Sequence, residues 1–193
     1  MELQNTLPCA AWDTPEAADP DILRAKAGDP AAFERIMKAN QALVYRTSLR
    51  LLGNADDALD ACQDTFLRLF RHLDKVDARR PIRPWLYRIT VNVCRDLAKR
   101  RRAFGAPPML PALPTADGRA HLHAREQTRI AETGLRTLSE HERMALVLRD
   151  IEGLSTREVA EILGSTQVTV RTQVCRARAK LRKYRDEFTG EIA

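Results

Sequence analysis

The strongest constraint on the fold lies in residues 153–183, GLSTREVAEILGSTQVTVRTQVCRARAKLRK. Two short helical patterns flank Gly164, a residue that takes the left-handed conformation with which many helices end. Ahead of it, Ser155 and Glu158 have the spacing of a capping box, in which each satisfies a backbone N–H of the other, and Ser139 with Glu142 makes another box that opens an earlier helix. Apolar residues then recur at helical intervals. The stretch therefore predicts two helices joined by a tight, glycine-centred turn.

The second of these helices combines an apolar face with a strongly basic one. Ser165 or Thr166 can cap it, and its candidates for the core are Val168, Val170 and Val174. Residues 171–185 contain five arginines, two lysines and no acid, which is the composition of a phosphate-binding surface. An amphipathic helix with a solvated basic side is the simpler alternative. The capping box, glycine turn and valine spacing together favour a helix-turn-helix whose second helix enters a DNA major groove.

Composition narrows the class of protein further. The 193 residues suffice for two small domains, and the net charge of +6 agrees with an acidic polymer as partner. Four cysteines, Cys9, Cys62, Cys94 and Cys175, lie far apart, which argues against a disulfide framework or a zinc site. We expect these cysteines to be reduced, those in helices to be buried, and no metal or cofactor to be bound. No signal peptide or membrane-spanning apolar run is visible, so the expected location is the cytoplasm.

The N-terminal half predicts three further helices. One begins at Asp29-Pro30, a cap followed by a proline at the first helical position, and ends at Gly53-Asn54. Asn54 or Asp56 caps the next, which extends to about His72. A third occupies residues 85–102. Residues 74–84 form a loop that contains two prolines.

The second of these helices has two distinct stripes. A core stripe at three- and four-residue intervals consists of Cys62, Phe66, Leu69 and Leu73. Another stripe gathers the acids Asp57, Asp60 and Asp64, with Gln63 beside them. Such acids commonly form no more than a solvated face. On a DNA-binding chain they can also serve as a docking surface for a basic protein.

These patterns predict an all-α fold of two small helical domains joined by a flexible proline-rich linker, the C-terminal domain being the helix-turn-helix. The expected divisions are a mobile tail 1–20, a first domain 21–102, a linker 103–125, a second domain 126–188 and a tail 189–193.

In this order the segments resemble a bacterial sigma factor of the sigma-70 family, in its small extracytoplasmic-function (ECF) group. Residues 57–66, DALDACQDTF, are similar to the family's polymerase-binding stretch, and residues 85–102 are similar to its −10 element helix. Residues 138–143 and 153–178 are similar to its −35 element domain, and the proline-rich linker has a suitable length.

The resemblance implies a role for each surface. The implied partner is core RNA polymerase, through its β′ clamp and β subunits. The residues that would dock on the clamp are Asp57, Asp60, Gln63, Asp64 and Phe66. Binding of the −10 element, including one base flipped from the duplex, would fall to Arg79, Arg80, Arg83, Asn92, Arg95, Lys99 and Arg100. Binding of the −35 element would fall to Arg171, Thr172, Cys175, Arg176 and Arg178. An anti-sigma factor is a further implied partner.

The sequence departs from the family pattern at two positions. Leu59 stands where an acid is common, so the docking surface is less polar, and Gln173 stands where relatives often carry a basic residue. One alternative is an autonomous helix-turn-helix regulator that binds operator DNA without polymerase. An enzyme using the three acids as metal ligands is another, but no histidine, glutamate or glycine-rich phosphate loop accompanies them. The expected function is promoter recognition without bond chemistry.

Overall fold

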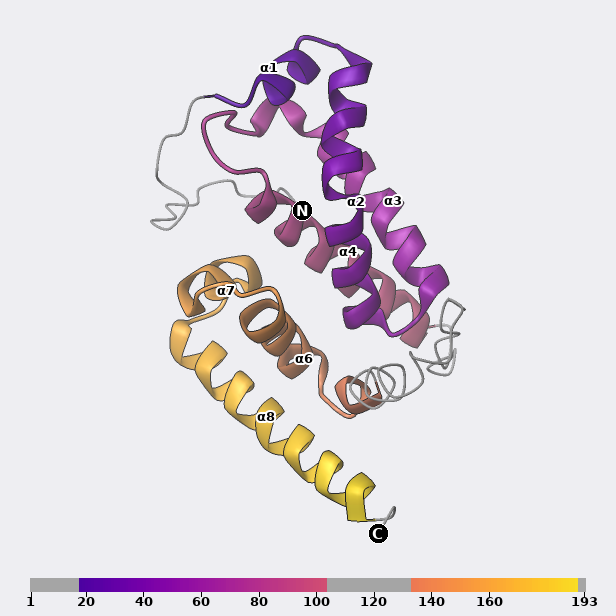
Figure 1. The fold of residues 1–193 in the computed structure, drawn as a ribbon, viewed down its shortest axis with the longest axis vertical. Coiled ribbons are helices and arrows are strands. Elements are labelled where there is room, and N and C mark those ends of the chain that lie inside the picture. Colours follow the sequence, from indigo (N-terminus) through magenta and orange to yellow (C-terminus); the bar gives the residue numbers. More distant parts are fainter. Residues whose placement is uncertain (1–17, 104–132, 191–193) are drawn as a thin grey trace, which may run out of the picture.

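The computed structural model describes residues 18–103 and 133–190, and the regular elements within these ranges are all helical. Figure 1 shows an N-terminal group of helices, α1 to α4, beside a C-terminal group, α6 to α8. The predicted all-α fold is confirmed. The predicted linker lies almost wholly outside the described residues.

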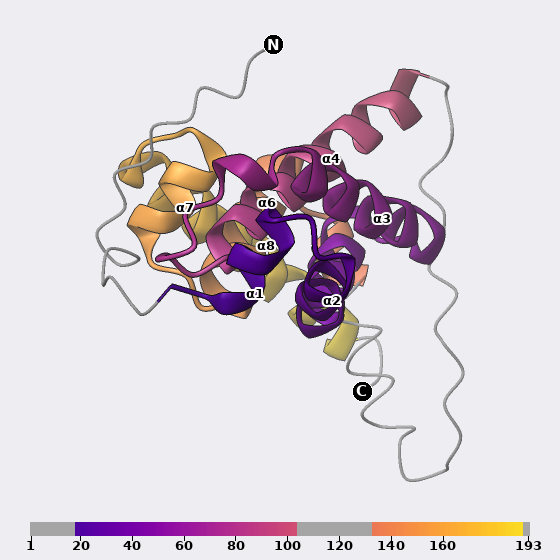
Figure 2. The same cartoon turned by 90° about the horizontal axis from the view of Figure 1, so that it is seen from above.

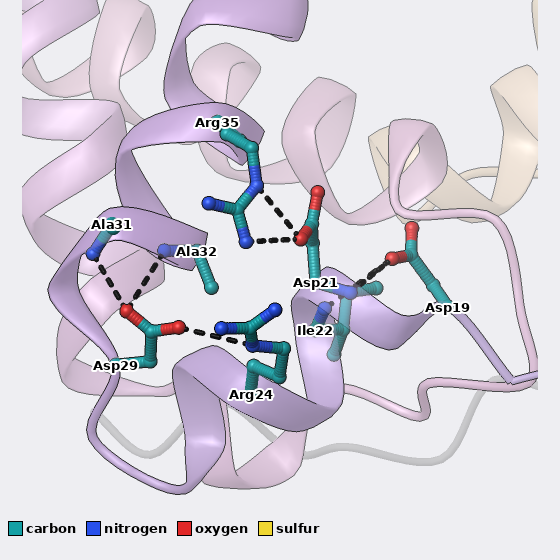
Figure 3. Close-up of polar contacts among 8 residues, drawn as sticks. All are labelled: Asp19, Asp21, Ile22, Arg24, Asp29, Ala31, Ala32 and Arg35. Carbon is teal, nitrogen blue, oxygen red and sulfur yellow. Dashed lines mark hydrogen bonds and ion pairs between the residues drawn. The ribbon is translucent and has the colours of Figure 1, made fainter.

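Two short Asp-Pro signals begin the N-terminal group. Helix α1 (Pro20–Lys26) is capped by Asp19 and helix α2 (Pro30–Leu52) by Asp29, whose carboxylates accept backbone N–H bonds of 2.9 Å at the first turn (Figure 3). Arg35 binds Asp21 at 2.6 Å and so ties α2 to α1. The start of α2 is confirmed, whereas α1 was not among the expected elements, although its signal is the same.

The remaining helices of this group enclose a core. Gly53, at φ 69°, ends α2, and Asn54 caps α3 (Ala55–Arg71) by accepting the Asp56 N–H at 2.9 Å. A short 3₁₀ turn (Leu73–Lys75) leads towards α4 (Arg83–Ala103), which begins two residues earlier than expected. Pro84 is tolerated there because N–H groups of a first turn have no helical acceptor. The core includes Val44, Leu69, Leu86, Val91 and Val93, all fully buried or nearly so.

The C-terminal group contains the predicted helix-turn-helix. Helix α6 (Glu140–Leu146) continues into a π-helical turn, η3 (Val147–Ile151), and α7 (Thr156–Leu163) and α8 (Gln167–Gly190) follow. Both capping boxes, Ser139 with Glu142 and Ser155 with Glu158, are formed. Gly164 has φ 63°, and the Thr166 hydroxyl caps α8 by accepting the Thr169 N–H at 3.1 Å. Each of these local predictions is confirmed.

The two groups are in contact. Helix α4 lies between α3 and the C-terminal helices in Figure 1, and the view from above in Figure 2 agrees. Helix α4 contacts α7, while α2 contacts α6 and η3. Among the helices described, none combines the length and the apolar character needed to cross a membrane. The arrangement leaves one side of α3 and the outer side of α8 free for partners.

Candidate functional site

The acidic stripe of α3 is divided by ion pairs. Asp57 is bound to Arg101 of α4, and Asp64 pairs with Arg68 at 3.3 Å. Asp60 and Gln63 remain exposed to solvent. Of the polar residues predicted to form a docking surface, these two are therefore the most accessible.

An apolar groove of about 350 Å³ lies beside them, between α2 and α3. Its lining includes Phe33 and Met37 from α2 and Phe66, Leu67 and Phe70 from α3. Phe66 is buried in the core, whereas Leu67 is 52% and Phe70 60% exposed. The rings of Phe33 and Phe70 meet edge to face, with centroids 5.1 Å apart.

We define the α3 face as Leu59, Asp60, Gln63, Leu67 and Phe70. Large apolar side chains clustered at a surface and edged by polar ones are typical of protein–protein interfaces. Sequence reasoning missed Leu67 and Phe70. The signal was present, because the core stripe through Phe66 and Leu69 leaves both outside the buried face.

The cations predicted to bind the −10 element differ in accessibility. Arg79, Arg83, Lys99 and Arg100 are exposed, as is Arg80, which pairs with Asp77 at 3.4 Å. Asn92 is half-buried. The assignment of these side chains to DNA stays a prediction.

Arg95, by contrast, is engaged by the C-terminal group. Its Nε atom lies 3.8 Å from a carboxylate oxygen of Glu140, and its Nη2 atom lies 3.7 Å from the sulfur of Met144. A cation expected to meet DNA phosphate thus contacts a carboxylate of α6.

The outer side of α8 carries the predicted −35 residues. Arg171, Thr172, Cys175 and Arg176 are exposed there, while Val170 and Val174 pack into the core. Arg178 makes two hydrogen bonds to Asp150, of 2.8 and 2.7 Å, which hold its guanidinium against the protein.

Two expectations for α8 were wrong. Val168 is 69% exposed and does not join the core, because it lies two residues from Val170 and thus on the other side of the helix. Cys175 is exposed rather than buried, since it points away from the face that packs on α6 and α7. Cys62 and Cys94 are buried as expected. Val168 is an exposed residue of this face that sequence reasoning missed.

The acids of α3 do not assemble a metal centre. Arginines bind Asp57 and Asp64 individually, and the part of the chain that the structure describes holds no group of three His, Cys, Asp or Glu residues placed to bind a metal ion.

Comparison with known proteins agrees with this geometry. The family model described as Sigma-70 region 2 matches residues 36–104, and the model described as Sigma-70, region 4 matches residues 129–181. ECF RNA polymerase sigma factor SigM of Mycobacterium tuberculosis H37Rv is 32% identical over 168 residues, covering 86% of this chain and 84% of SigM. RNA polymerase sigma factor CnrH of Cupriavidus metallidurans is 38% identical over 183 residues, covering 86% and 94% of the two chains.

Solved structures include a similar arrangement. The structure of CnrH in complex with the cytosolic domain of CnrY has a TM-score of 0.65 and 29% identity, and the match covers 86% of this chain and 96% of that one.

Proposed function

This chain belongs to the sigma-70 family of RNA polymerase sigma factors, in its ECF group. From that premise we propose which of its surfaces bind core polymerase and which bind promoter DNA. The protein is a sigma factor that binds core RNA polymerase and directs it to promoter DNA. The observation that carries the proposal is the helix-turn-helix, which buries Val170 and Val174 of α8 and leaves its basic side exposed, on a chain whose other half matches region 2. An autonomous operator-binding regulator would not account for the match of residues 36–104 to region 2.

We assign core polymerase to the α3 face. Asp60 and Gln63 supply polar complementarity to a basic helical partner, and the adjoining groove supplies apolar area to bury. Of the other residues in the predicted set, Asp57 and Phe66 act chiefly by holding α3 in place, since Asp57 binds Arg101 of α4 and Phe66 is buried. Asp64 pairs with Arg68 of the same helix and is partly exposed, so it remains available to the partner.

Promoter DNA takes the two basic surfaces. Arg79, Arg80 and Arg83 with Asn92 bind the −10 element, and Arg95, Lys99 and Arg100 bind its phosphates. Arg171 and Arg176 contact the −35 major groove, with Thr172 and Cys175 beside them and Arg178 near the backbone. Val168 adds an apolar surface of the kind that contacts thymine methyl groups. By analogy with CnrH, whose structure was solved with CnrY, we also propose an anti-sigma partner.

Run-off transcription tests this function. Core polymerase on genomic fragments should yield discrete transcripts only when the protein is added. Asp60→Lys should reduce them about tenfold or more at limiting protein, because like charges facing each other at an interface cost several kcal/mol. Glu34→Lys on α2, where Glu34 contacts Lys38 at 2.6 Å, is the matched charge reversal and should transcribe normally.

A different result would contradict the proposed function. Tight binding of duplex DNA by the protein alone, with no core-dependent transcript, would establish the autonomous regulator instead.

Arg171→Ala should weaken holoenzyme binding to a promoter found in that assay by about 5- to 150-fold, the range for loss of one base-reading arginine. Arg182→Ala removes the same side chain about 16 Å further along α8 and should have little effect. Competition binding with −35 sequence variants measures both. Equal weakening by the two substitutions would remove Arg171 from the groove.

A further inference from the structure

Glu152 connects the two halves of the chain. It follows the π-helical turn η3, and its side chain is only 12% exposed. One carboxylate oxygen accepts hydrogen bonds from the Thr47 hydroxyl at 3.1 Å and from Arg50 at 2.8 Å, both on α2. The other oxygen accepts a bond of 2.9 Å from the Tyr87 hydroxyl on α4.

Three donors from two helices thus converge on this one carboxylate, between the two groups of helices. Thr47 is fully buried and Tyr87 nearly so. Burial and the hydrogen bond to Glu152 also raise the pKa of Tyr87, which keeps its hydroxyl protonated as a donor. Hydrogen bonds to a charged group are the stronger class, and here they are partly shielded from water.

A second carboxylate acts at the other end of α4. Glu140, the first residue of α6, binds Arg102 at 2.6 Å and lies 3.8 Å from Arg95. A carboxylate presents to an arginine two oxygens much as a phosphate does. Glu140 therefore forms an ion pair with Arg95, a residue that the proposed function assigns to promoter phosphate.

The contact also carries a cost that favours reversibility. The Nε atoms of Arg95 on α4, which faces Glu140 and Met144, and of Arg143 on α6 are both buried without a hydrogen-bond partner. A buried donor left unsatisfied is unfavourable, and it regains water if α6 moves away.

We propose that Glu152 and Glu140 hold the C-terminal helices on α2 and α4 in a closed state that competes with promoter DNA for Arg95. The inference rests on the proposed function, because it concerns access to a surface assigned to the −10 element. In the closed state Glu152 holds the C-terminal helices against α2 and α4, and Glu140 pairs with Arg95 and Arg102. Opening frees Arg95 and Arg102 together.

The test uses the full chain without polymerase. Glu152→Gln keeps the shape of the side chain and removes its charge, and Tyr87→Phe removes one donor without changing charge. Glu161→Gln is the matched control, because Glu161 pairs with Arg157 inside α7 and changes net charge equally. Small-angle X-ray scattering measures the radius of gyration, and fluorescence anisotropy measures binding of a labelled 20-nucleotide single strand of mixed sequence.

Glu152→Gln should enlarge the radius of gyration and tighten binding of the single strand about fivefold or more, the lower end of typical coupling between sites. Tyr87→Phe should act in the same direction to a smaller extent, and Glu161→Gln should match the native chain. If Glu152→Gln and Glu161→Gln give the same radius, the closed state is overturned. An enlarged radius with unchanged DNA affinity would overturn the competition.

These outcomes are separate from failure of the proposed function. Neither readout contains polymerase. If the scattering and binding results are as expected but no run-off transcript appears, the closed state stands and the proposed sigma-factor function is overturned.

Discussion

Leu67→Lys is expected to weaken binding to core RNA polymerase by about 30-fold or more, as for an interface residue that contributes about 2 kcal/mol. Leu67 lies at the edge of the groove between α2 and α3 and is 52% exposed in the free protein. A lysine there keeps the helix, because lysine has a high helix propensity. It replaces apolar contact area with a charge that repels a basic partner.

Leu23→Lys on α1 is a closely matched control. Leu23 is 51% exposed and is not part of the groove lining. Core binding measured by fluorescence anisotropy, with thermal unfolding to check the fold, should separate the two variants. Equal core affinities for both would show that polymerase docks elsewhere than the α3 face.

Leu148→Ala is expected to lower the free energy of unfolding by about 2–5 kcal/mol, the usual cost of truncating a buried leucine. Leu148 lies in the π-helical turn η3 and is fully buried in the core of the C-terminal group. Its loss leaves a cavity beneath the helix-turn-helix. Transcription from promoters that depend on the −35 element should fall accordingly.

Ile151→Ala changes the same turn at an exposed position and should alter the unfolding free energy by less than about 0.5 kcal/mol. Urea denaturation followed by circular dichroism compares the two. A similar loss for both would mean that the turn, rather than the Leu148 side chain, is the sensitive element.

The features that the sequence predicted well are those determined locally. Asp29-Pro30, the two capping boxes and Gly164 act through bonds spanning two to four residues, so the pattern alone is sufficient. Helix α1 has the same type of start at Asp19-Pro20, but its seven residues are too few to display a helical period.

The features that were missed depend on distant partners. Asp57 was expected to share one docking stripe with Asp60 and Asp64, yet Arg101 on α4, 44 residues further along the chain, binds it. Likewise, nothing near Glu152 in sequence indicates that Thr47 and Tyr87 will surround it. Val168 differs, because its spacing from Val170 was enough to exclude it from the core.

The π-helical turn before Glu152 makes the number of residues in this segment as important as their identity. The Glu152 N–H bonds to the Val147 carbonyl at 2.9 Å, five residues back, so η3 holds one residue more than an α-helical turn. Deleting one residue would restore the α-helical register and rotate the following chain by about 100°. Relatives that differ in length here would thus orient their carboxylate differently, even with every interacting side chain retained.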